Sequence, residues 1–218
     1  MLFDLEREAL IASGLRDEDR TSEYMAKLQS LCRPFVSQGD VPPSILTKAK
    51  GLFDWLWKSK PTRYRLQGHW RLHNVIDAQI SEGNHAVGNC LGLTLLYNCL
   101  LRRIGIEAEA LYLENAFGIA PHVLTLLRVN DSTIDIDHML PEGFDYRGHL
   151  EYPGRTRWGD RELIADIYHS VGNEQFERGD LPEALENYHE AIRLNPGYER
   201  AQLNKTILMD RLRTEEKG

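Results

Sequence analysis

Residues 90–105 read Cys-Leu-Gly-Leu-Thr-Leu-Leu-Tyr-Asn-Cys-Leu-Leu-Arg-Arg-Ile-Gly, an apolar stretch that begins with a cysteine and ends with a glycine. The stretch predicts a buried helix that ends at Gly105, because a glycine commonly follows the last residue of a helix. The segment before it, residues 82–89, contains two glycines and two asparagines and predicts a loop. We therefore expect Cys90 at the start of a helix, where unpaired backbone N–H groups and the helix dipole favour a thiolate.

Two interpretations of Cys90 stay open on this evidence. Free cysteine is among the most buried residue types, so the thiol is either a member of the core or a nucleophile. The chain also contains Cys32 and Cys99. Cys90 and Cys99 would lie about 13.5 Å apart along one helix, which excludes a disulfide between them. Three cysteines make no disulfide framework, and we expect a cytoplasmic location, where thiols stay reduced.

After this helix, apolar residues alternate with polar ones in three stretches, as they do in strands. The stretches are residues 106–113, 122–129 and 133–137. Residues 130–132 predict a turn between the last two of them. A helix that precedes antiparallel strands predicts an α+β fold, in which the helix bearing the cysteine packs on an antiparallel sheet.

The expected register of the hairpin puts three polar side chains on one face of the sheet. With the turn centred on residues 131–132, Leu126 pairs with Asp137. Because side chains alternate between the faces of a strand, His122, Asp135 and Asp137 then share a face. We expect Asp137 to be the partner of His122, since it lies nearer to that end of the hairpin, and Asp135 stays an alternative. The competing interpretation leaves both aspartates on a solvated face.

The segments around this core complete the predicted organisation. Residues 1–60 predict an N-terminal helical segment that packs on the core, with a second helix interrupted at Pro34 and a third opened by residues 42–43. The core itself is assigned to residues 61–160. Its last part, residues 138–161, contains repeated glycine and proline and predicts a loop.

Residues 161–213 predict a single tetratricopeptide repeat followed by a capping helix. Six residues match the repeat in register: Tyr168, Gly172, Ala184, Tyr188, Ala191 and Pro196. Gly172 and Ala184 are small where the two helices press together, and residues 179–180 supply the turn between them. A lone repeat cannot stack its apolar face on a neighbouring repeat, so we do not expect the peptide groove of a long array.

Composition and charge exclude several functional classes. The chain has 218 residues, of which 42% are hydrophobic and 27% charged, a balance that suits a packed core and a hydrated surface. The formal net charge of −7 disfavours binding to nucleic acid or to an anionic membrane. We expect no membrane span, because no apolar run is long enough, and no signal peptide, because the first residues are charged.

Cys90, His122 and Asp137 together would form a catalytic triad. A thiol needs a base to become a nucleophile near neutral pH, and an imidazole within hydrogen-bond reach supplies that base. A carboxylate fixes the tautomer of the imidazole and stabilises its positive form.

The backbone around the thiol would bind the developing oxyanion. One donor would be the N–H of the cysteine at the helix start, and a second would come from Gln79, Asn84 or His85. Gly88 and Gly92 would let a substrate approach the backbone closely.

Four stretches resemble the transglutaminase-like superfamily of papain-type cysteine hydrolases. They are Gly88-Asn-Cys90-Leu-Gly-Leu-Thr-Leu-Leu, Arg102-Arg-Ile-Gly-Ile-Glu-Ala108, Pro121-His122 and Ile136-Asp137. With the tetratricopeptide tail, the chain is similar to the SirB-like subgroup of that superfamily. The resemblance covers residues 70–213 and implies a papain-like α+β core, with Cys90 as nucleophile, His122 as base and Asp137 as the residue that orients the base.

The resemblance implies a cysteine hydrolase or acyltransferase that acts on an amide or thioester through an acyl-enzyme at Cys90. It implies no metal and no organic cofactor. The partners we expect are a protein or peptide substrate and a protein that binds the C-terminal helices. The alternative function is a non-catalytic interaction module, in which the transglutaminase-like fold and the tetratricopeptide helices serve as a scaffold.

Overall fold

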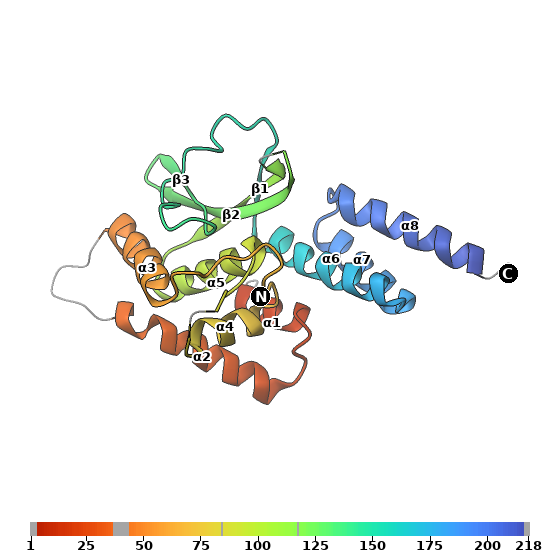
Figure 1. The fold of residues 1–218 in the computed structure, drawn as a ribbon, viewed down its shortest axis with the longest axis horizontal. Coiled ribbons are helices and arrows are strands. Elements are labelled where there is room, and N and C mark those ends of the chain that lie inside the picture. Colours follow the sequence, from red (N-terminus) through yellow and green to blue (C-terminus); the bar gives the residue numbers. More distant parts are fainter. Residues whose placement is uncertain (1–3, 37–43, 84, 117, 216–218) are drawn as a thin grey trace. The chain divides into compact units, whose positions relative to one another are not determined.

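The computed structural model describes residues 4–36, 44–83, 85–116 and 118–215, and its fold is α+β (Figure 1). The chain divides into two compact units, residues 1–159 and residues 160–218. In the first unit the described helices are α1 (Leu5–Ala12), α2 (Glu18–Val36), α3 (Ile45–Ser59), α4 (Leu72–Ile80) and α5 (Cys90–Arg103). Its strands are β1 (Ala108–Ala116), β2 (Ala120–Val129), β3 (Ser132–Ile136) and β4 (Arg155–Trp158). The second unit contains α6 (Asp160–Arg178), α7 (Leu181–Leu194) and α8 (Glu199–Glu215).

Helix α5 forms the centre of the first unit. All of its residues from 91 to 101 are buried. The helix contacts α1–α4 and the strands β1 and β2, and Figure 1 shows it beneath the sheet. Its buried polar groups donate hydrogen bonds to neighbouring backbone: Thr94 Oγ1 to Val123 O at 3.2 Å. The hydroxyl of Tyr97 likewise donates to Ala49 O in α3, at 2.7 Å. A helix buried on every side is held by packing, which fixes the position of its first residue.

Helix α2 is longer than the sequence predicts. Pro34 does not interrupt it, because the helix continues through the proline to Val36. A proline inside a helix loses one backbone hydrogen bond and crowds the carbonyl four residues earlier, so the last turn has to be held by packing. Phe35 packs edge-on against Trp55 of α3, with ring centroids 5.5 Å apart. The predicted helix start at residues 42–43 lies outside the described residues.

The sheet has the strand order β3-β2-β1-β4, and every neighbouring pair is antiparallel. The predicted pairing of Leu126 with Asp137 is wrong by two residues, since Leu126 pairs with Asp135. The turn is tighter than predicted because Asn130, with φ of 54°, adopts the left-handed conformation that asparagine tolerates. Side chains alternate between the two faces with a period of two residues, so a shift of two leaves each side chain on the same face. Asp137, directly after β3, is therefore still on the face that carries His122.

A fourth strand lies within the predicted loop. β4 pairs with β1 along residues 155–158, and the prediction of a loop there is wrong. Trp158 is buried and stacks on Tyr112 of β1, with ring centroids 4.1 Å apart and planes 5° from parallel. The strand is only four residues long and follows a proline and a glycine, so its pattern is too short to detect by periodicity.

The second unit is a helical hairpin followed by a third helix, and the pair fits the tetratricopeptide pattern. A Cβ added to Gly172 of α6 would lie 2.6 Å from Cε1 of Tyr188 in α7, so only glycine allows the two helices to approach this closely. Gly179, with φ of +86°, forms the turn between them. Helix α7 ends two residues before Pro196. None of the helices in the described ranges combines the length and the apolar character needed to cross a membrane.

Candidate active site

Cys90 begins helix α5 and is partly exposed, whereas Cys32 and Cys99 are buried. The helix is capped by Asn89, whose side-chain oxygen accepts a hydrogen bond from Gly92 N at 3.1 Å. The N–H groups of the first two helical residues stay outside the helical ladder. The thiol thus lies beside backbone donors and at the positive end of the helix dipole, unlike the buried thiols of Cys32 and Cys99.

Gly88 and Gly92 lie against the protein's own chain. A Cβ at Gly88 would be 2.7 Å from His69 O, and one at Gly92 would be 2.5 Å from the same oxygen. The side chain of Val75 closes the remaining space at Gly92, because its Cγ2 would lie 2.7 Å from such a Cβ. The prediction that these glycines give a substrate access to the backbone is therefore wrong. Their small size instead lets the segment before α4, and α4 itself, pack against the start of α5.

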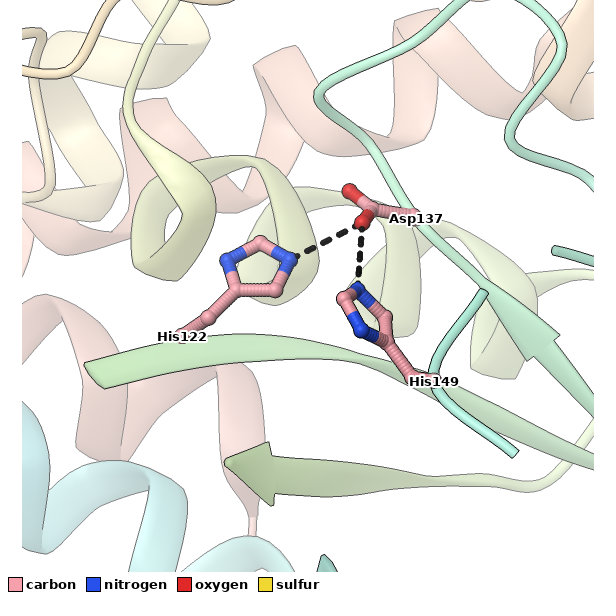
Figure 2. A group of neighbouring side chains, drawn as sticks. All are labelled: His122, Asp137 and His149. Atoms are coloured by element: carbon pink, nitrogen blue, oxygen red, sulfur yellow. Dashed lines mark hydrogen bonds and ion pairs between the residues drawn. The ribbon is translucent and has the colours of Figure 1, made fainter. Parts of the chain in front are cut away.

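His122, on β2, lies in contact with Asp137, which directly follows β3. Nε2 of His122 is 3.0 Å from Oδ2 of Asp137, as Figure 2 shows. The second carboxylate oxygen, Oδ1, accepts a hydrogen bond from Met139 N at 2.9 Å. The side chains of His122 and Asp137 are 5% and 0% exposed. The backbone donor fixes the carboxylate, and the carboxylate in turn holds the imidazole in one orientation.

A third side chain, His149, meets the same carboxylate. Its Nε2 is 3.3 Å from Oδ2 of Asp137, so both imidazoles point a ring nitrogen at one oxygen (Figure 2). His149 reaches this place because the chain after β3 folds back on the strand, where Asp137 N donates to Gly143 O at 2.8 Å. His149 is not among the site residues predicted from the sequence. It lies in a segment with no periodic pattern, and the only signal there was a histidine among glycines and aromatic residues.

Asp135, the alternative partner of His122, is directed elsewhere. Its two carboxylate oxygens accept hydrogen bonds from Nη1 and Nη2 of Arg155 at 2.7 and 3.0 Å. Arg155 Nη1 also donates to His149 O at 2.8 Å. This two-pronged ion pair anchors the loop that brings His149 to Asp137.

Charge and hydrogen bonding connect the thiol to the histidine. Burial alone would lower the pKa of His122, but hydrogen bonds to Asp137 and Cys90 and the negative charges of both groups raise that pKa to about 10. Burial would raise the pKa of Asp137, but hydrogen bonds from His122 and His149 hold it well below its usual range. Around neutral pH the ring of His122 is therefore protonated and positively charged, and the carboxylate of Asp137 is negatively charged. The ring of His122 lies between the thiol and the carboxylate.

Tyr64 lies near the thiol, in the segment between α3 and α4. It forms a parallel bridge with Gly88. Burial raises the pKa of Tyr64 to about 12, with smaller contributions from the charges of Cys90 and Asp137. The phenol therefore keeps its proton near neutral pH.

The three residues predicted as a second oxyanion donor lie in different surroundings. Gln79 is buried and its amide is already used, since Oε1 accepts from Arg63 Nη1 at 3.1 Å and Nε2 donates to Ser59 Oγ at 3.0 Å. The prediction is wrong for Gln79, because its amide holds the connection between α3 and α4. His85 is exposed, and Asn84 lies outside the described residues.

His122, Asp137 and His149 also have the spacing of a metal site. Their ligand atoms all lie within 4.8 Å of one another, and two imidazoles with a carboxylate suit zinc or iron(II). However, the distances from Oδ2 of Asp137 to Nε2 of His122 and of His149, 3.0 and 3.3 Å, are those of hydrogen bonds. His122 is also hydrogen-bonded to Cys90. Hydrogen bonds therefore explain why the three side chains lie together, and a metal ion would bind only by displacing the protons of these bonds.

Comparisons with known proteins identify the C-terminal repeat. A family model described as a TPR repeat matches residues 172–205, which span the end of α6, all of α7 and the start of α8. No curated protein and no solved structure matches the chain. The match confirms the repeat expected from the sequence and lies entirely within the second unit.

Proposed function

We propose that the first unit is a transglutaminase-like cysteine hydrolase or acyltransferase with a papain-like core. The observation that supports this most is the series of contacts that leads from Cys90 through His122 to Asp137. A thiol at a helix start, an imidazole bonded to it and a buried carboxylate behind the imidazole are the groups that a cysteine nucleophile requires. A purely structural thiol fits the buried Cys32 and Cys99 better than the partly exposed Cys90.

In the proposed reaction, the thiol of Cys90 passes its proton to His122, and the sulfur attacks the carbonyl carbon of an amide or thioester. A C–S bond forms while the carbonyl electron pair moves to oxygen. When the carbonyl forms again, the bond to the leaving group breaks, and the amine or thiol departs with a proton from His122. Water, which gives a proton to His122, then attacks the acyl-enzyme, releases the acid and restores the thiol. An amine that takes the place of water gives acyl transfer.

The remaining groups have supporting roles in this proposal. Asp137 keeps the ring of His122 oriented and stabilises its positive form. The N–H of Cys90 and the hydroxyl of Tyr64 are the donors we assign to the oxyanion, because the phenol stays protonated close to the thiol. His149 is a positioning residue that acts through Asp137. We propose a protein or peptide as the substrate that carries the amide or thioester.

Acyl-enzyme trapping tests the proposal. The full chain is mixed with p-nitrophenyl acetate, and the covalent product is located by peptide mass spectrometry. We expect one acetyl group on Cys90 of the wild type and a burst of nitrophenol of matching size. The His122→Ala variant should lose the burst, whereas Cys99→Ala, which removes a buried thiol of the same helix, should keep it. Acetylation at the same slow rate in the wild type and in His122→Ala would contradict the proposal.

The alternative function is a non-catalytic interaction module, and the second unit supports it. Tetratricopeptide repeats commonly mediate contacts between proteins, and residues 172–205 match such a repeat. The second unit also has a cavity of about 330 Å³. Its lining includes Asn173, Phe176, Glu177, Tyr188, Asn204 and Ile207. Failure of acyl trapping in a folded wild-type protein would leave this scaffold function as the better account.

A further inference from the structure

Arg63 is a fully buried arginine in the connection between α3 and α4. Only 1% of its surface is exposed. Its carbonyl oxygen accepts hydrogen bonds from Val87 N and Gly88 N, at 2.8 and 3.1 Å. The residue is thus held against the segment that leads to α5, but it has no part in the reaction proposed above.

The guanidinium group of Arg63 is only partly satisfied. Nη1 donates to Gln79 Oε1 at 3.1 Å. Nε and Nη2 are buried and have no hydrogen-bond partner among the described residues. In an arginine these two N–H groups point in the same direction from one edge of the planar group, and that fork matches the two oxygens of a carboxylate.

Trp57 adds a further unpaired donor in the same neighbourhood. Its ring centroid lies 5.8 Å from the guanidinium carbon of Arg63. Its Nε1 is also buried and finds no acceptor within the described part of the chain. Three buried donors without an acceptor are unfavourable unless an acceptor enters the site.

Within the described ranges, Arg63 forms no ion pair with a carboxylate either. Burial lowers the pKa of Arg63 to about 9, whereas a nearby carboxylate would raise that pKa. His138 supplies no negative charge, since burial and then the charge of Arg63 lower its pKa to about 3 and keep it neutral. A buried cation without a counter-ion is costly, so the acceptor that fits here is an anion.

We propose that the Nε–Nη2 edge of Arg63 binds a small carboxylate, of the size of formate, inside the first unit. Its two oxygens accept one hydrogen bond each from the fork, and its charge neutralises the guanidinium. Because Arg63 is 1% exposed, the anion we propose is a small one, and its effect is to stabilise the fold. The site is independent of the chemistry proposed for Cys90.

The test follows the Nε–H signal of Arg63 by ¹⁵N nuclear magnetic resonance while sodium formate is added to the full-length protein. Burial protects this proton from exchange with water, and its signal is assigned by its loss in Arg63→Lys. We expect a saturable shift with formate and none with sodium gluconate, a larger carboxylate, at equal ionic strength. At ten times the dissociation constant, formate should also raise the melting temperature of the first unit by about 3 °C or more.

The variants and the second anion decide between explanations. Arg63→Lys keeps the charge but loses the fork, and it should lose the thermal response, whereas Arg65→Lys, a change at an exposed arginine of the same loop, should keep it. An unchanged response in Arg63→Lys would overturn the proposal. So would a response to chloride but not to formate, or the absence of any saturable shift, which would mean that water alone fills the fork. The wild-type titration decides the question even if Arg63→Lys does not fold.

Discussion

The two units differ in how far apart along the chain their defining residues lie. In the second unit, Gly172 and Tyr188 meet across one helical hairpin, and regular spacing identifies them. In the first unit, the groups that meet come from a helix start, a strand, a strand end and a loop: Cys90, His122, Asp137 and His149. Local spacing is therefore enough to identify a repeat, whereas the candidate site depends on the register of a sheet and the path of a loop.

The positions of the tryptophans allow this comparison to be tested. All four, Trp55, Trp57, Trp70 and Trp158, belong to the first unit. Tryptophan fluorescence therefore reports unfolding of the first unit, while far-ultraviolet circular dichroism reports on the helices of both. A substitution can thus be assigned to the unit that it destabilises.

The largest effect is expected for Asp137→Ala. The change removes the acceptor for His122, His149 and Met139 N, and loss of one partner from a buried ion pair costs about 3–5 kcal/mol. Urea unfolding followed by tryptophan fluorescence should show this loss in the first unit. The control is Asp131→Ala, a change at an exposed aspartate of the neighbouring turn. Equal unfolding midpoints for Asp137→Ala and the wild type would show that the carboxylate does not anchor the site.

The next largest effect is a pH dependence confined to the first unit. The raised pKa of His122 contributes stability that is fully present below about 6.5 and is lost as the pH rises through about 10. The lowered pKa of Asp137 contributes stability that is present above about 3.8 and is lost as the pH falls through its lower value in the folded protein.

The lowered pKa of His138, about 3, makes the neutral form of this buried ring contribute stability that is lost as the pH falls below about 6.5. Stability of the first unit should thus be greatest near pH 6.5 and fall by on the order of 3 kcal/mol toward pH 9. The measurement is urea unfolding by tryptophan fluorescence across this range. His122→Gln should flatten the alkaline decline, because it removes the group that titrates. A decline of the same steepness in this variant would assign the pH dependence to other groups.

A smaller effect, in the second unit, is expected for Gly172→Ala. The added methyl group would lie 2.6 Å from the ring of Tyr188, and such overpacking costs about 2 kcal/mol. Circular dichroism should show a lower melting temperature for the helices of the second unit, with the tryptophan signal unchanged. Gly197→Ala is the matched control, since the nearest atom to its Cβ, Asn195 Oδ1, is 3.7 Å away. Equal effects of the two changes would contradict the close helix contact.

The smallest effect is expected for His149→Gln. Without this imidazole the carboxylate of Asp137 loses one of the donors that fix it, and the ring of His122 is held less rigidly. We expect alkylation of Cys90 by iodoacetamide to slow by about tenfold, the lower end of the effect of losing a residue that orients a metal-binding histidine. His85→Gln, at an exposed histidine, is the control. An unchanged rate in a folded His149→Gln protein would remove the positioning role.

The sequence predicts those elements whose pattern is local. The Cys90 helix begins and ends as expected because its apolar run is bounded by Asn89 and Gly105. The tetratricopeptide pair is likewise found, since the small residues of both helices lie at fixed intervals. The register of the hairpin is off by two residues, because the left-handed conformation of Asn130, which tightens the turn, leaves no mark on the alternation.

Parts of the candidate site depend on contacts that no local pattern carries. The contact of His122 with Asp137 follows from the parity of the strands, which the error of two residues preserves. The position of His149 depends on a loop that is held by the Asp135–Arg155 ion pair. The catalytic roles of Cys90, His122 and Asp137 stay predictions.

The alkylation rate of Cys90 is the most direct measure of whether His122 activates the thiol. The wild type and His122→Ala are treated with iodoacetamide at about pH 6.5, where an ordinary thiol is protonated, and labelling is followed by peptide mass spectrometry. We predict labelling of Cys90 much faster than that of Cys32 and Cys99, and loss of that advantage in His122→Ala. Equal, slow labelling of all three cysteines in the folded wild type would contradict an activated thiol.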